Sequence, residues 1–224
     1  MNVSMEKIID DIEKETKANF VDNPQKRTIS DLHDSLKYRM GKAKTIPILY
    51  ELAINENYEE LQKKEISKEF VLTYHYENYL VNLISIGDII ALLTKYTYKI
   101  EGDDDYCTLK KVLNRDNKKF YRTLCDKKIY AELDKLDKYL DEPREERNSI
   151  IHKGKSNSDE IKQLKQYSNA TQRKFDNVCK SRYSVPLLRN PNLPLKTMNE
   201  LNASLIKYIS PILESIGLEF NQRF

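Results

Sequence analysis

The segment between Ser67 and the acidic turn at Glu101 carries apolar side chains at helical spacing on more than one face. This pattern predicts a long central helix that is buried on two sides, with Ser67 as a candidate N-cap. The apolar residues are Phe70, Val71, Tyr74, Leu80, Val81, Leu83, Ile84, Ile86, Ile89, Ile90, Leu92 and Leu93. The most apolar part, Tyr79 to Leu93, contains Asn82 and Asp88, and we expect it to be too short to span a bilayer.

The composition favours an all-α fold. The 224 residues include 5 glycines and 7 prolines, which leaves little material for the tight turns of an all-β protein. Three widely spaced cysteines without a CxxC pair, and three histidines, argue against a zinc site and against a disulfide framework. The sequence contains no phosphate-loop or dinucleotide-binding motif. The N-terminus lacks a secretory apolar core, so we expect a cytoplasmic protein without a membrane association.

Further helices are predicted on both sides of the central one from apolar spacing and proline positions. Pro47 is expected near the first turn of a helix, and Asp141-Glu142-Pro143 is expected to start a new one. The last helix is expected to be interrupted near Ser210-Pro211 and to close with Gly217, after an irregular stretch over residues 182–194. The predicted helices cover residues 3–19, 32–40, 48–61, 107–113, 118–140, 143–152, 160–179 and 196–216.

An aspartate run, Asp103 to Asp105, follows the central helix. It lacks the alternating ligands, the central glycine and the distant glutamate of a calcium loop. We therefore predict a solvated turn here, with no metal ion.

Positive charge is concentrated late in the chain. The net charge of the whole protein is +3, which is too small to mark a general nucleic-acid binder. Between Pro143 and Asn192, however, eleven Lys and Arg residues face five Asp and Glu residues. A basic stretch of this kind can hold phosphates, although a solvated helix face is the more common explanation.

One segment of this basic region combines a cation, an amide and an imidazole: Arg147-Asn148-Ser149-Ile150-Ile151-His152, followed by Lys153-Gly154. Successive helical residues rotate by roughly 100°, so Asn148 and His152 share a face, and Arg147 can reach it from the edge. Histidine moves protons near neutral pH, and arginine presents a fixed fork of donors to a phosphate. Such a set suits RNA transesterification, with His152 as the base for a ribose 2′-OH and Arg147 stabilising the transition state.

A structural role for the same segment remains open from the residues alone. A histidine and a lysine at a helix C-terminus interact favourably with the helix dipole. Arg147 would equally well pair with Glu145, Glu146 or an acid on another helix.

This segment resembles the Arg-x4–6-His signature of the HEPN superfamily (higher eukaryotes and prokaryotes nucleotide-binding), in which a polar residue follows the Arg, as Asn148 does here. The resemblance implies a helical bundle that dimerises and places the Arg and His of both protomers in one composite cleft. It implies a metal-independent endoribonuclease of toxin–antitoxin or phage-defence systems that needs no cofactor. Arg147, Asn148 and His152 would be the catalytic residues, and an acid on the central helix, Glu77 or Asp88, would support them.

We therefore expect an all-α, HEPN-like helical bundle. Its expected parts are an N-terminal helical extension over residues 1–66, the domain over residues 67–217 and a tail over residues 218–224. The expected partners are RNA, a second copy of the chain, and an antitoxin or regulatory protein. The alternative is a non-catalytic HEPN-like module that binds RNA, a nucleotide or a protein. The residues predicted to hold RNA are Lys153, Lys155, Lys162, Lys165, Arg173 and Lys174.

Overall fold

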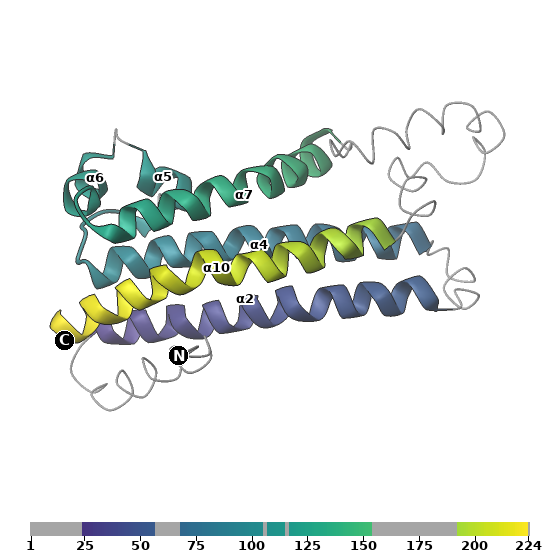
Figure 1. Cartoon of the computed structure of the whole chain (residues 1–224), viewed down its shortest axis with the longest axis horizontal. Helices are drawn as coiled ribbons and strands as arrows, with labels where there is room; N and C mark the ends of the chain where they lie inside the picture. The colour runs from purple at the N-terminus through teal and green to yellow at the C-terminus, as the bar shows by residue number, and fades with distance from the viewer. Residues whose placement is uncertain (1–23, 57–67, 105–106, 115–116, 154–191, 224) are drawn as a thin grey trace. The chain divides into compact units, whose positions relative to one another are not determined.

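The computed structural model describes residues 24–56, 68–104, 107–114, 117–153 and 192–223, without the side chains of Glu69 and of residues 149–153. Helices make up most of this part of the chain, and it contains no strand (Figure 1). They are α2 (Pro24–Asn55), α4 (Lys68–Thr97), α5 (Leu109–Leu113), α6 (Lys118–Leu124), α7 (Lys128–Lys153) and α10 (Asn192–Arg223). The predicted all-α fold is confirmed.

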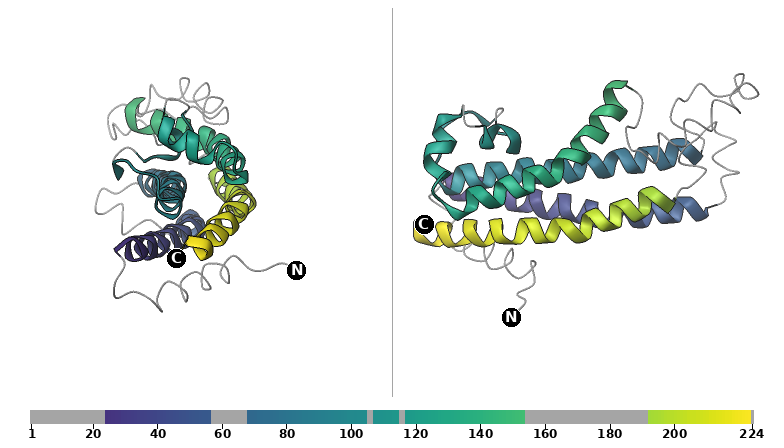
Figure 2. Two further views of the ribbon diagram at one scale, coloured as in Figure 1. Left: turned by 90° about the vertical axis from the view of Figure 1, so that its left-hand side faces the viewer. Right: turned by 45° about the horizontal axis from the view of Figure 1, so that its top comes forward.

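The chain forms two compact units. Unit 1 consists of Met1–Gly41, Ile84–Leu140 and Ala203–Phe224, and unit 2 of Lys42–Leu83 and Asp141–Asn202. The four long helices α2, α4, α7 and α10 each contribute one segment to each unit, while α5 and α6 belong to unit 1 alone. Figure 2 draws these helices in two further views. The predicted short helix over residues 118–140 is therefore two elements, because the chain turns at residues 125–127 between α6 and α7.

Helix α4 supplies the largest share of the buried apolar side chains, as its sequence predicts. In unit 1 these include Ile86, Ile90 and Leu93, and in unit 2 Leu72 and Leu83, all of them fully buried. The stretch expected to be too short for a bilayer, Tyr79 to Leu93, is part of a longer helix, and by length and composition Phe70–Thr97 could cross a membrane. In its most apolar window 67% of the residues are buried inside the protein, which is the pattern of a core helix.

Helix α2 runs without interruption through Pro47, so the two separate helices predicted here are one. Proline has no N–H, which leaves the carbonyl oxygen four residues earlier, that of Ala43, without its helical donor. Asn202 of α10 donates its amide N–H to this oxygen at 2.8 Å, and the Tyr79 hydroxyl of α4 donates to Asn202 Oδ1 at 3.1 Å. A side chain from another helix thus replaces the hydrogen bond that the proline removes.

Helices α7 and α10 also continue where the sequence predicted breaks. Pro143 lies inside α7, and Pro211 and Gly217 lie inside α10. In α7 the buried residues recur every three or four positions up to Pro143, so they form one continuous stripe along the helix. Packing of this stripe outweighs the local cost of the proline. They are Ile129, Leu133, Leu136, Leu140 and Pro143 itself.

One further boundary can be compared with the prediction. Helix α10 begins at Asn192, so the expected irregular stretch is wrong for residues 192–194. Pro194 is tolerated there because N–H groups of the first helical turn have no partner inside the helix. The helices predicted over residues 3–19 and 160–179 lie outside the described residues.

Candidate functional site

Arg147 and Asn148 lie in the last turns of α7, in unit 2. The helix continues to Lys153, as predicted, so the backbone of His152 belongs to the same helix. Asn148 and His152 are four residues apart, which places their Cα atoms on one face of α7. The imidazole of His152 lies outside the described side chains.

The guanidinium of Arg147 is held by its neighbour. Its Nε donates to Asn148 Oδ1 at 3.2 Å, and Nη2 donates to the same oxygen at 2.7 Å. Asn148 is exposed, and Arg147 is half-buried. Asn148 therefore fixes one edge of the arginine side chain, and the rest of the guanidinium's five N–H donors point away from this contact.

Within the part of the chain that the structure describes, Arg147 forms no ion pair with a carboxylate. Arg144, three residues earlier on α7, does form one, because its Nη1 lies 3.2 Å from Asp141 Oδ1. The described residues therefore do not show the alternative in which Arg147 pairs with Glu145 or Glu146. A half-buried arginine held only by an amide keeps its charge available for an anionic ligand.

The two acids that were candidates for supporting Arg147 and His152 have different surroundings in the structure. Asp88 lies in unit 1, where its Oδ1 accepts a hydrogen bond from the backbone N–H of Leu109 at 3.1 Å and so caps α5. Glu77 lies in unit 2, as Arg147 does, and is half-buried. Burial raises the pKa of the Glu77 carboxyl above its ordinary value. Glu77 is therefore the better candidate.

The residues predicted to hold RNA lie beyond the end of α7. Lys153 is the last residue of that helix, and its side chain is outside the described set. Lys155, Lys162, Lys165, Arg173 and Lys174 lie outside the described residues altogether.

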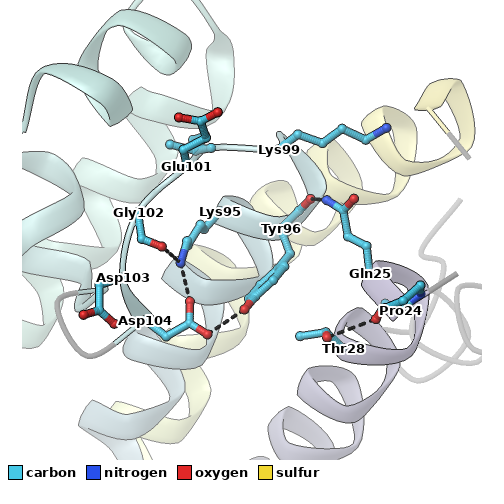
Figure 3. A pocket seen from close by; sticks show the side chains of 11 residues that line it. Pro24, Gln25, Thr28, Lys95, Tyr96, Lys99, Glu101, Gly102, Asp103 and Asp104 are labelled. Atoms are coloured by element: carbon cyan, nitrogen blue, oxygen red, sulfur yellow. Dashed lines mark hydrogen bonds and ion pairs between the residues drawn. The ribbon is translucent and has the colours of Figure 1, made fainter.

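A pocket of about 630 Å³ lies in unit 1, and it contains none of the predicted site residues (Figure 3). Its lining comes from the start of α2, the end of α4 and the turn that follows. The lining residues are Pro24, Gln25, Thr28, Lys95, Tyr96, Lys99, Ile100, Glu101, Gly102, Asp103 and Asp104.

Polar side chains that line this pocket form hydrogen bonds and an ion pair with one another. Lys95, which is almost fully buried, donates to Asp104 Oδ1 and to the Gly102 carbonyl oxygen, the latter at 2.6 Å. The Tyr96 hydroxyl donates to Asp104 Oδ2 at 2.5 Å, and this bond raises the pKa of Tyr96 to about 12. Burial raises the pKa of Asp104, but the bonds from Lys95 and Tyr96 outweigh it and hold that pKa below its ordinary value.

The turn over residues 101–104 is exposed, as predicted, and Asp104 in addition accepts hydrogen bonds from Lys95 and Tyr96. The sequence did not predict the ion pair between Lys95 and Asp104, which are nine residues apart on either side of the end of α4. The pocket is lined by a network that fastens the turn to α4. Among the residues that the structure describes, no group of three or more His, Cys, Asp or Glu could hold a metal ion.

Comparison with protein families defines the class of this helical chain. A family model described as HEPN_Cthe2314-like HEPN matches residues 23–210, more than three quarters of the sequence. The chain belongs to the HEPN superfamily, and within it to this family. The match begins just before α2, a helix that was expected to belong to an N-terminal extension. Searches among curated proteins and among solved structures gave no match.

Proposed function

We propose that the protein is a metal-independent endoribonuclease that acts in the cytoplasm and cleaves RNA at Arg147, Asn148 and His152. The observation that carries the proposal is the state of Arg147, whose guanidinium is held by Asn148 and has no carboxylate partner among the described residues. Membership of the HEPN superfamily supports it, because this superfamily includes many ribonucleases.

In the proposed reaction, His152 accepts the proton of a ribose 2′-OH, and the 2′-oxygen attacks the adjacent phosphorus. The bond from phosphorus to the 5′-oxygen breaks, and the leaving oxygen takes up a proton. The products are a 2′,3′-cyclic phosphate and a 5′-hydroxyl end. Arg147 stabilises the negative charge that develops on the phosphoryl oxygens, and Asn148 keeps the guanidinium in place.

Two copies of the chain would form the composite cleft that the resemblance implies, with an Arg147 and a His152 from each. The basic residues Lys153, Lys155, Lys162, Lys165, Arg173 and Lys174 would hold the phosphates of the RNA. A role in toxin–antitoxin or phage-defence systems, with an antitoxin or another regulatory protein as a further partner, belongs to the same proposal.

The test is cleavage of end-labelled single-stranded RNA in excess EDTA. We expect the wild-type protein to produce cyclic-phosphate ends, and Arg147→Ala and His152→Ala to lower the rate at least about 100-fold each. Lys138→Ala is the matched control, because Lys138 is an exposed cation on the same helix that pairs with Asp134. It should cleave like the wild type.

Cleavage that survives both substitutions would contradict the assigned site. RNA binding without cleavage, unchanged in His152→Ala, would instead favour the non-catalytic binding module.

A further inference from the structure

Helix α4 exposes two large aromatic side chains in unit 2. Phe70 is 59% exposed and Tyr74 is 56% exposed. The two residues are four positions apart, so their side chains are neighbours on one face of the helix. Their ring centroids lie 6.5 Å apart, and the ring planes differ by only 16°. The two rings therefore form one ordered, near-parallel aromatic pair on the surface.

The ring of Tyr74 is also held by its neighbour His75. The tyrosine and imidazole rings meet edge to face, with centroids 5.9 Å apart and planes at 65°. His75 is half-buried, and burial lowers its pKa, so the imidazole adds no positive charge to the pair at pH 7. Two ring contacts thus orient Tyr74 before any ligand arrives, which reduces the ordering entropy that binding costs.

The aromatic surface ends after these two rings. The next positions on this face of α4 are Glu77 and Asn78, and the amide of Asn78 donates to the Tyr74 carbonyl oxygen at 2.8 Å. A helix of another protein would need apolar anchors that continue over further turns of α4. A nucleobase needs only a ring face, because every base has a π-face that stacks on an aromatic side chain. The size of the pair therefore favours a base over a protein partner.

We propose that Tyr74 and Phe70 form a stacking site for the unpaired bases of single-stranded RNA. The inference rests on the proposed function and adds base contacts on α4, in the unit that contains Arg147. Arg147 and the basic residues after it contact phosphates, whereas the two rings contact bases. Bases inside a duplex are already stacked on one another, so the site takes single-stranded RNA.

The test is the affinity of the full-length protein for an end-labelled, single-stranded 2′-O-methyl RNA, measured by fluorescence anisotropy. This RNA lacks the 2′-OH of the proposed reaction, so binding is measured without cleavage. We expect Tyr74→Leu to raise the dissociation constant at least about fivefold, and Phe70→Leu to raise it as well. Tyr74→Phe keeps the ring and should bind like the wild type.

Tyr38→Leu is the matched control, because Tyr38 is a 60% exposed tyrosine on α2 in unit 1. It should leave the affinity unchanged. Circular dichroism checks that the helical content of every variant equals that of the wild type.

Two further measurements separate base stacking from a loss of phosphate contacts. The slope of log dissociation constant against log salt concentration should be the same for Tyr74→Leu and the wild type, because a neutral ring releases no counterions. An oligonucleotide of the same length made of abasic sites should bind the wild type and Tyr74→Leu equally.

Equal affinity of Tyr74→Leu and the wild type for the base-containing RNA would overturn the stacking site, as would an equal loss with the abasic oligonucleotide. Cleavage of unmodified RNA by the wild type would then still support the proposed function. Absence of cleavage together with ring-dependent binding would remove the proposed reaction and leave the stacking site in place.

Discussion

Arg147 in unit 2 is held differently from the paired cations of unit 1. In unit 1, Lys95 is paired with Asp104, and both Lys127 and Arg223 are paired with Glu219. Lys127 and Arg223 also lie over the ring of Tyr98, at 5.0 and 5.8 Å from its centroid. In unit 2, Arg144 has a carboxylate partner, but Arg147 is held by an amide alone among the described residues.

This difference distinguishes cations that hold the fold from a cation available for a ligand. A buried or half-buried charge that is already matched contributes to stability, and its removal leaves a partner unsatisfied. When a charge is held only by a neutral group, its removal costs the protein little stability, but any bound anion loses its contact. Substitutions in unit 1 should therefore change stability, whereas substitution of Arg147 should change activity.

The largest expected effect on stability is that of Lys95→Met. Loss of the ammonium leaves Asp104 and the Gly102 carbonyl oxygen without their donor, which should lower the free energy of unfolding by about 2 kcal/mol. Urea denaturation followed by circular dichroism measures this change. RNA cleavage by the folded variant should match that of the wild type, and a selective loss of cleavage would contradict the division between the units.

A smaller loss is expected at Asn202, which replaces the hydrogen bond that Pro47 removes. Asn202→Ala leaves the Ala43 carbonyl oxygen and the Tyr79 hydroxyl with fewer partners, and should cost about 1–2 kcal/mol. If Pro47 is the reason, Pro47→Ala should make Asn202 less important, since the backbone N–H that this substitution restores then donates to the Ala43 carbonyl oxygen. A double-mutant cycle of the two substitutions measures the coupling, and a coupling near zero would show that Asn202 has another role.

The hydrogen bond from Asn202 to Ala43 illustrates which parts of the fold can be predicted from the sequence and which cannot. Helix α4 was predictable because its apolar spacing is a local property of one continuous segment. Pro47, Pro143 and Pro211 were misread as helix boundaries because the local cost of proline is visible in sequence and its compensation is not. Asn202 is 159 residues from Ala43 along the chain, and no pattern near Pro47 indicates it.

The candidate site was predictable to a similar degree. The positions of Arg147 and Asn148 on one helix followed from their spacing, and so did the end of that helix near His152. The hydrogen bonds from Arg147 to Asn148, and the engagement of Asp88 with α5, depend on side-chain and tertiary geometry. Only the structure could therefore favour Glu77 over Asp88.

A gain of stability is expected at the end of α4. Lys99 has a φ of 54°, in the left-handed region, while Ile100 N–H bonds to the Lys95 carbonyl oxygen and Lys99 N–H to that of Tyr96. This is the helix-ending arrangement in which glycine is preferred. Lys99→Gly should raise the free energy of unfolding by about 0.5–1 kcal/mol without changing cleavage. Lys110→Gly, inside α5, is the contrasting control and should be destabilising.

The smallest expected effect on stability is that of Glu77→Gln, which tests the better candidate for a supporting acid in unit 2. Because burial raises the pKa of Glu77 in the folded protein, ionisation of this group opposes folding. The unfavourable contribution is absent below the unfolded-state pKa and is complete above the folded-state pKa. Glu77→Gln should therefore be more stable than the wild type at pH 7 and equal to it in acid, as measured by urea denaturation at both pH values. If Glu77 also supports Arg147, the variant will lose cleavage activity while it gains stability, and unchanged cleavage would confine Glu77 to a packing role.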